Sequence, residues 1–334
     1  MKKLFLLMAM ALPVCLFTAC SSDDDEDGGD APGGSMSSSV TEIKGSDGKT
    51  VRLSSDGYYN YSYDEKSNLT GIYEDYVTLQ VSNNPFKVSG DFDGVDLSMT
   101  AEFNNKGYFS KMKSIYKYDV KEENYSISET IDENVTFSYD NEGHLTKITG
   151  TTKATGTENG VKYTVSYTGV ATYTWKNGVL VEATSVSTGT EDGETWTESE
   201  TATFQFDDNY PNPCLQYTIS QENLGEIEGA FQRLGFCGKG SAKLPSSVVY
   251  VDIDTSNGEE TYNREYTVPC SYTFTNNGTV KTETCKNTYY YTYTNEAAED
   301  EPLPHNLPMA KAAKQASSLR PLFFSKRLHR NRQK

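Results

Sequence analysis

Histidine is scarce in this chain, and the patterns that most catalytic and metal sites require are missing. The 334 residues include three histidines, His144, His305 and His329. No two of them have the spacing of zinc ligands, and the chain has no Gly-x-Ser-x-Gly, His-Glu-x-x-His or phosphate-loop motif. We therefore predict no catalytic residue, no cofactor and no metal site, and a protein that is not an enzyme.

Positive charge is also in short supply. The chain has 47 Asp and Glu against 30 Lys and Arg, which gives a net charge of −17. A surface that binds nucleic acid needs a basic footprint, so we predict no nucleic-acid partner. Solubility is the simplest explanation of the acidity.

The first twenty residues have the pattern of a targeting segment. Two lysines precede an apolar stretch, 4–17, that is too short to span a bilayer comfortably. The sequence Leu-Phe-Thr-Ala-Cys at 16–20 resembles a bacterial lipobox, which implies cleavage before Cys20 and a lipid on its thiol. The alternative is an ordinary signal peptide with an incidental cysteine. We assign residues 1–19 to a lipoprotein signal peptide and predict that Cys20 attaches the chain to a membrane.

An acidic run and a Gly/Ser-rich stretch follow this cysteine. Five like charges at 23–27 must stay solvated, and Gly/Ser-rich chain behaves as flexible coil, so we assign residues 20–39 to a tether. The acidic run resembles the surface-export signal of Bacteroidota lipoproteins, with a plain solvated tether as the alternative. The resemblance implies an outer-membrane protein that is lipid-anchored and faces the cell exterior.

Residues 137–148 have the pattern of a strand, a tight turn and a second strand. Phe137 and Tyr139 lie on one face of the first strand, because side chains alternate. Residues 140–143 are of types that tolerate left-handed turn conformations. Leu145 and Ile148 begin the return strand, and their spacing of three predicts a bulge or an early end of the strand.

Variants of this hairpin recur from residue 40 to about residue 295. The aromatic residues Tyr63, Phe103, Tyr139 and Trp175, which close strands before turns, are 40, 36 and 36 residues apart. Such a period is typical of a repeated supersecondary unit, and we expect about four strands per unit at a spacing of ~8–12 residues. Residues 40–300 are therefore predicted to form an all-β, mainly antiparallel domain. The sheet is a long curved meander, or a small barrel or half-barrel.

One stretch of the domain has a helical period instead. The apolar residues Leu224, Ile227, Phe231 and Leu234 are spaced 3, 4 and 3 apart. Ser220 can cap the start of a helix and Gly235 suits the position after its end. We predict one helix of about fourteen residues over 221–234, packed against the sheet.

The composition changes again after residue 301. Residues 302–334 contain eight Lys or Arg and no acid, with three early prolines. The simplest interpretation of 301–334 is a basic, disordered tail. A role in binding a membrane surface or a partner is the alternative.

Four cysteines remain beyond the signal peptide and Cys20. An even number in an exported chain indicates two disulfides, with four free thiols as the alternative. Asn277-Gly278 predicts a two-residue hairpin turn, across which opposed residues have numbers that sum to 555. Cys270 and Cys285 satisfy this sum, so we predict a cross-strand disulfide between them at a hydrogen-bonded site. Cys214 and Cys237 are left to form a second disulfide.

Aromatic side chains are the remaining candidates for ligand contact. Trp175, Trp196 and the Tyr-rich strands could stack on sugar rings, since an aromatic face offers an apolar platform with a polar rim. The alternative is that these rings belong to the core and to cross-strand pairs.

Taken together, these features resemble the Bacteroidota surface lipoproteins of a domain family of unknown function with a porin-like fold. The resemblance rests on the lipobox, the acidic run, the Tyr-x-Tyr-Asp-x-x-Gly hairpins and the segment 236–248, and it covers residues 40–295. The hairpins also resemble YD repeats, which form curled β-sheet shells. The family has no known catalytic residues. We therefore predict a surface protein that binds a glycan or an envelope component, with a hydrolase of a surface polymer as the alternative function.

Overall fold

The structure is a computed structural model that describes residues 38–294, except 93, 123–124, 192–193, 208, 222–225 and 286. The predicted signal peptide, the lipidation site Cys20, most of the tether and the basic tail 301–334 lie outside the described residues.

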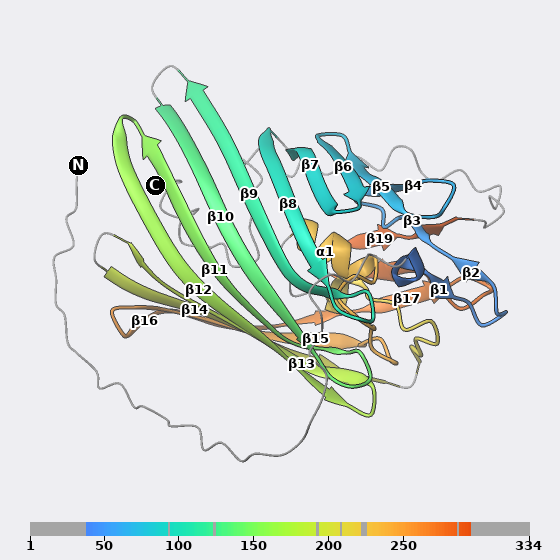
Figure 1. The fold of residues 1–334 in the computed structure, drawn as a ribbon. Helices are drawn as coiled ribbons and strands as arrows, with labels where there is room; N and C mark the ends of the chain where they lie inside the picture. Colours follow the sequence, from blue (N-terminus) through green and yellow to red (C-terminus); the bar gives the residue numbers. More distant parts are fainter. Residues whose placement is uncertain are drawn as a thin grey trace, which may run out of the picture.

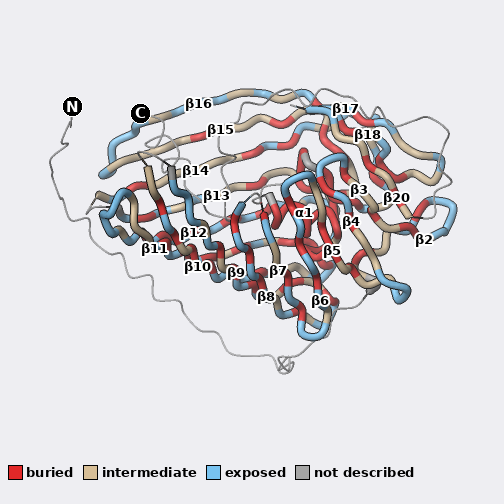
Figure 2. The backbone as a smooth tube through the Cα atoms, turned by 90° about the horizontal axis from the view of Figure 1, so that it is seen from above, coloured by how far each residue is buried: buried red, intermediate tan, exposed pale blue. Residues whose placement is uncertain are grey.

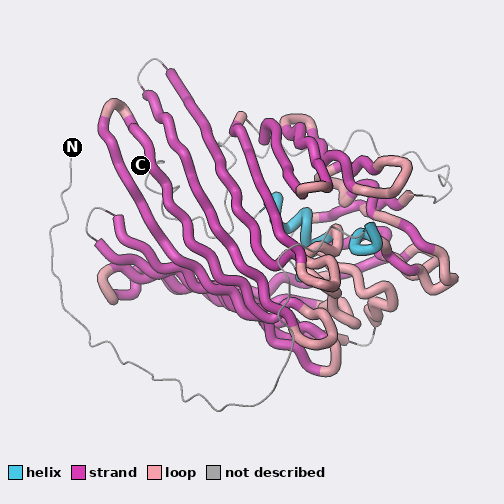
Figure 3. Tube along the Cα trace, viewed as in Figure 1, coloured by secondary structure: helices cyan, strands magenta, loops and turns pink. Residues whose placement is uncertain are grey.

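β-Strands dominate this domain, and α1 is the one α-helix among the described residues (Figure 3). The strands are β1 Ile43–Lys44, β2 Thr50–Val51, β3 Leu53–Ser55, β4 Asn60–Tyr63, β5 Leu69–Glu74, β6 Val77–Asn83, β7 Phe86–Phe92, β8 Val95–Phe103, β9 Phe109–Glu122, β10 Tyr125–Tyr139, β11 Leu145–Glu158, β12 Val161–Lys176, β13 Val179–Glu191, β14 Glu194–Gln205, β15 Ser247–Ser256, β16 Glu259–Pro269, β17 Ser271–Phe274, β18 Val280–Thr284, β19 Thr288–Tyr290 and β20 Thr292–Tyr293. The helices are η1 Ser38–Thr41, η2 Ile219–Gln221 and α1 Glu226–Arg233, of which the first two are 3₁₀ turns.

Fifteen of these strands form one antiparallel sheet whose spatial order follows the chain from β3 to β16 (Figure 1). The exception is β20, which returns from the end of the domain to pair with β3. The two outermost strands, β16 and β20, are not hydrogen-bonded to each other, so the sheet is a curved, open meander. The small sheet β17–β18–β19 lies between these two edges (Figure 2). The predicted all-β meander is confirmed.

The long strands explain the period in the sequence. Strands β9 to β13 contain 13 to 16 residues each. A unit of 36 residues in this region therefore holds two long strands and two turns, whereas the first unit, from Tyr63 to Phe103, holds the four strands β5 to β8. The prediction of four strands per unit is confirmed for the first unit and is wrong for the two 36-residue units, because it assumed strands of ordinary length.

The predicted hairpin chemistry is confirmed at the recurring turns. In each, the first turn residue donates its backbone N–H to the carbonyl four residues on, at 2.8–3.0 Å, and its side-chain oxygen accepts backbone N–H groups of the turn. These residues are Asp64, Asn104 and Asp140. The ladder shifts register just before each turn, as at Ser138/Tyr139, where the bulge was predicted. Gly143 takes the left-handed conformation that completes its turn, with φ 96°.

The aromatic residues that precede the turns also make polar contacts. Three of these side chains donate a hydrogen bond to the carbonyl of the first residue of the preceding strand. The pairs are Tyr63–Leu53 at 2.7 Å, Tyr139–Phe109 at 2.8 Å and Trp175–Leu145 at 2.7 Å. Tyr and Trp supply both a ring to pack and a polar group to donate, so each anchor ties two strand ends together.

The described α-helix lies within the predicted range 221–234. It covers eight residues, Glu226–Arg233, and residues 222–225 are outside the described chain. Ser220 does not cap it; this residue lies in η2, and its backbone N–H donates to Glu283 at 2.7 Å. Gly235 has φ 90°, as expected after a helix end. Phe231 of α1 packs on the sheet within a cluster of buried phenylalanines.

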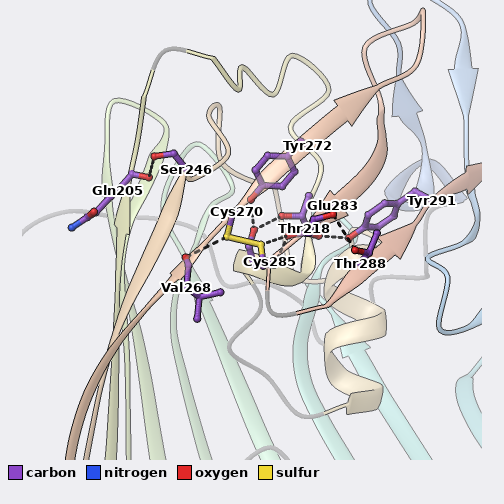
Figure 4. The surroundings of a disulfide bond; sticks show 12 residues. Gln205, Thr218, Ser246, Val268, Cys270, Tyr272, Glu283, Cys285, Thr288 and Tyr291 are labelled. Atoms are coloured by element: carbon purple, nitrogen blue, oxygen red, sulfur yellow. Dashed lines mark hydrogen bonds between the residues drawn. A yellow bond between two sulfur atoms is a disulfide. The ribbon is translucent and has the colours of Figure 1, made fainter. Parts of the chain in front are cut away.

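The predicted disulfide between Cys270 and Cys285 is present (Figure 4). The turn is not the predicted two-residue one, because Thr275 pairs with Thr279 and only Gly278 has a positive φ. A bulge at Thr273/Phe274 then restores the register, so that Ser271 and Thr284 are opposed. The Cα atoms of the two cysteines are 4.3 Å apart, which fits a non-hydrogen-bonded pair rather than the predicted hydrogen-bonded one.

The second predicted disulfide is not formed, since Cys214 and Cys237 are free thiols. The Cys214 sulfur lies 3.9 Å from the carbonyl oxygen of Asn277, at the tip of the last hairpin. Cys237 is buried just after α1, and the next residue, Gly238, lies against the Tyr139 ring, which a Cβ at 238 would approach to 3.1 Å. Different elements therefore surround the two thiols, which the count of cysteines could not reveal.

Candidate functional site

The inner face of the long sheet changes character along its strands. Near the recurring turns it is apolar and packs against α1 and its phenylalanines. Toward the opposite end, the inward positions of β10, β12, β14 and β15 carry carboxylates and aromatic side chains instead. Residues 129, 133, 198, 200, 252 and 254 supply these carboxylates, and we call them the acidic inner face.

Two pairs of like charges lie directly opposite each other on this face. Glu198 of β14 is the register partner of Asp254 of β15, and Glu200 is the partner of Asp252. They point inward because they alternate along β14 with outward-facing residues and are followed on the same face by buried Ala202. Opposed like charges destabilise a sheet. Four carboxylates in two adjacent rows are therefore difficult to explain as a stabilising device.

Two further carboxylates come from β10. Glu133 is fully buried and Glu129 nearly so. Tyr163 crosses over Gly156 to donate a hydrogen bond to Glu129 at 2.7 Å, and a Cβ at position 156 would lie 2.7 Å from the Tyr163 hydroxyl. The Thr152 hydroxyl is 3.4 Å from Glu133. All six acidic residues take part in polar or electrostatic interactions.

Tyr167 of β12 lies in the same row as Glu133, with Thr152 of β11 between them in the register. Burial raises the pKa of its hydroxyl, and the charges of Glu133, Glu129 and Glu198 raise this pKa further. The hydroxyl makes no hydrogen bond of normal length within the described chain, although Thr152 is near enough to lower its pKa. The glycine at 189, its cross-strand partner, leaves space for the ring of Trp196 beside it.

Aromatic residues border the acidic inner face at its outer strands. Tyr250 of β15 and Tyr266 of β16 are opposed and stack, with ring centroids 5.2 Å apart and planes at 20°. The Arg264 guanidinium lies 4.6 Å from the Tyr266 ring and is opposite Asp252 in the register. The half-buried stacked rings and the charged groups beside them can contact a ligand with both apolar and polar surfaces.

The two tryptophans singled out in the sequence are not brought together on an open surface. Trp196 is 3% exposed and packs against Tyr167, with ring centroids 5.7 Å apart. Trp175 is half-buried, stacks on His144 at 4.4 Å and donates to Leu145. Trp196 borders the acidic inner face, whereas Trp175 lies eight residues further along β12 than Tyr167, at the turn end.

The outer face of the same strands has shallow hollows. One of about 580 Å³ is lined mainly by hydroxyl and amide side chains of β10 to β14, and one of about 630 Å³ continues it over β8 to β11. Ligand sites usually combine such a volume with apolar and aromatic walls. The only ring among the residues that line either hollow is that of Tyr167, which points inward, so the inner face is the stronger candidate.

The described residues offer neither a cluster of metal ligands nor a membrane-spanning helix. The described residues contain no group of three or more His, Cys, Asp or Glu arranged to hold a metal ion. None of the helices described is long and apolar enough to span a bilayer.

Reasoning from the sequence missed the acidic inner face. Its residues come from three strands, and their proximity depends on a register that runs across β10 to β15. A local signal was nevertheless present. Glu198-Ser-Glu200 and Asp252-Ile-Asp254 each place two acids on the same face of a strand.

Comparison with known proteins yields structural likeness alone. No protein-family model and no curated protein matches the sequence. The fold is similar to a porin-like protein from Bacteroides vulgatus, with a TM-score of 0.44, 13% identity, and coverage of 77% of this chain and 99% of that one. It is also similar to a porin-like protein from Bacteroides uniformis, with a TM-score of 0.39, 16% identity, and coverage of 75% and 93%.

Proposed function

We propose that this chain is a lipid-anchored protein of the outer membrane that binds a glycan, without cleaving it, through the acidic inner face. The observation that carries the proposal is the juxtaposition of opposed carboxylates with stacked tyrosines on β14, β15 and β16. Carboxylates accept hydrogen bonds from sugar hydroxyls, and aromatic rings pack against the apolar faces of sugars. The Bacteroidota lipoprotein resemblance of the N-terminal segment supports the location.

The charge of the face selects the class of glycan. Six carboxylates accompany one guanidinium, Arg264, among the residues named for this face. Like charge across an interface costs affinity, so uronic-acid and sulfated polymers are poor ligands. A neutral glycan, or one that carries amino groups, is the expected ligand.

Binding is tested by a glycan array with the full chain, made soluble by Cys20→Ser, and then by calorimetry with the glycan retained. The double variant Glu200→Gln/Asp252→Asn should weaken binding at least tenfold, since each hydrogen bond to a charged group contributes roughly 1.5–3 kcal/mol. The matched control is Asp91→Asn/Asp96→Asn, an opposed and exposed acid pair on the outer face of β7 and β8. It should bind as wild type does.

Three results would count against this proposal: retention of no neutral or amino glycan, preference for anionic glycans, or equal effects of the two double variants. Products are analysed in the same samples. Recovery of the intact glycan supports binding alone, and its release as shorter fragments would favour the alternative hydrolase.

The location is tested through the anchor. Cys20→Ala should remove the protein from the membrane fraction or leave its signal peptide uncleaved, because no thiol remains to carry the lipid. Replacing the acids at 23–27 by Asn should keep the anchor but reduce digestion by external protease. A processed Cys20→Ala protein that still sediments with membranes would disprove lipid anchoring. Unchanged digestion of the second variant would disprove the role of the acidic run in export.

A further inference from the structure

We propose that the basic segment 302–334 of this same chain occupies the acidic inner face. The inference does not depend on glycan binding, because it concerns what this face contacts when no other ligand is present. It also goes beyond that function, since an occupant from the same chain would compete with a ligand.

Charge complementarity is the first argument. The segment has eight Lys or Arg and no acid, while the rest of the chain is strongly acidic. The acidic inner face concentrates six carboxylates on three strands, with two like-charged pairs directly opposed. A cationic occupant would turn this repulsion into attraction, and Arg in particular binds carboxylates with two parallel hydrogen bonds.

The chain path allows the contact. The last described residue, Thr294, is held beside β3, where its N–H donates to Arg52 at 2.8 Å. The first basic residue of the segment, Lys311, is 17 positions beyond Thr294, and a fully extended chain of that length spans about 56 Å. The basic residues can therefore reach distant parts of the domain, including the face that they would cover.

Burial is a separate observation that points to an occupant. The Tyr167 hydroxyl is buried on this face and makes no hydrogen bond within the described chain. A buried phenol oxygen that accepts no hydrogen bond suits a donor such as a guanidinium or an ammonium group.

Zero-length cross-linking with a carbodiimide tests the proposal, because it joins a lysine to a carboxylate only when the two are in contact. The full chain with Cys20→Ser is used without added glycan. We expect amide cross-links from Lys311, Lys314, Lys326 or Lys334 to the peptides that contain residues 198–200 or 252–254. They should disappear in high salt, which screens the attraction, and in the variant Glu198→Gln/Glu200→Gln/Asp252→Asn/Asp254→Asn.

The outer-face variant Asp91→Asn/Asp96→Asn is the matched control and should keep these cross-links. Equal cross-linking of the lysines to outer-face acids would overturn the proposal. So would cross-links that join labelled and unlabelled copies in a mixed sample, because the occupant would then be a second copy. Absence of cross-links to the acidic inner face at low salt would overturn it as well.

Thermal unfolding gives a second, independent measurement. Ending the chain at residue 301 should lower the unfolding midpoint, because four opposed carboxylates lose their counter-charges. The same truncation in the fourfold variant should shift the midpoint much less. Equal shifts in the two backgrounds would show that the segment stabilises the domain from elsewhere, and would overturn the proposal. Neither measurement involves a glycan. This proposal can therefore fail while glycan binding is confirmed, and glycan binding can fail while this proposal is confirmed.

Discussion

Replacing Asp56 with Asn should lower the free energy of unfolding by about 3–5 kcal/mol, the usual cost of breaking one partner of a buried ion pair. Asp56 is fully buried in the turn between β3 and β4, and Arg233, in the last turn of α1, is 5% exposed. The carboxylate accepts a hydrogen bond from the Arg233 Nε at 2.8 Å. It also accepts from the Tyr61 hydroxyl and from the backbone N–H groups of Tyr58 and Tyr59.

Asn has the shape of Asp and can still accept the backbone N–H groups, but it leaves the guanidinium buried without a countercharge from β3–β4. Urea unfolding followed by circular dichroism measures the change, with Asp47→Asn as the control. Asp47 forms an exposed pair with Lys49, and exposed pairs contribute little, so the control should unfold as wild type does. A loss below about 1 kcal/mol for Asp56→Asn would mean that water reaches the Asp56–Arg233 pair.

Phe109→Ala should destabilise the domain by about 3–5 kcal/mol as well, since it removes a large side chain from a close-packed core. The Phe109 ring is fully buried and stacks on Phe236 at 5.2 Å, with planes at 13°. It also contacts the rings of Phe86, Phe103, Phe137 and Phe231 at 5.4–5.9 Å. The cluster joins β7, β8, β9 and β10 to α1 and to the segment after it, so the cavity left by the substitution would lie where five elements meet.

Tyr76→Ala is the control for this substitution, because Tyr76 is 72% exposed. Its unfolding midpoint should stay close to that of the wild type. The double variant Phe109→Ala/Phe236→Ala should cost less than the sum of the single changes, since each removes the other's stacking partner. A strictly additive double variant would show that the two rings do not support each other.

Features set by neighbouring residues could be predicted from the sequence. The turn at 140–143, its bulge and the positive φ of Gly143 depend on the residues within a few positions. The alternation of apolar and polar residues predicted antiparallel strands with one buried face for the same reason. The pairing of Cys270 with Cys285 was also predicted correctly. The turn is longer than predicted and the strand has a bulge that was not predicted, and the two differences cancel in the register.

Features set by distant parts of the chain could not be predicted. The length of β9 to β13 depends on pairing along the whole sheet, so the period alone did not give the strand count. Cys214 and Cys237 invited a disulfide by elimination, yet packing around α1 and the last hairpin keeps them as thiols. The acidic inner face required the register of six successive strands, from β10 to β15, and a slip of one residue would have moved its acids outward.

The open form of the long sheet leaves a row of backbone donors and acceptors along β16, and such an edge invites pairing with another molecule. The sequence of β16 opposes this. Glu259, Glu260, Arg264 and Glu265 are exposed along the strand, and Pro269 ends it with a residue that has no N–H to donate. The opposite edge, β20, is two residues long. Charge, proline and brevity thus keep an unclosed fifteen-stranded sheet from growing by addition of strands from other molecules.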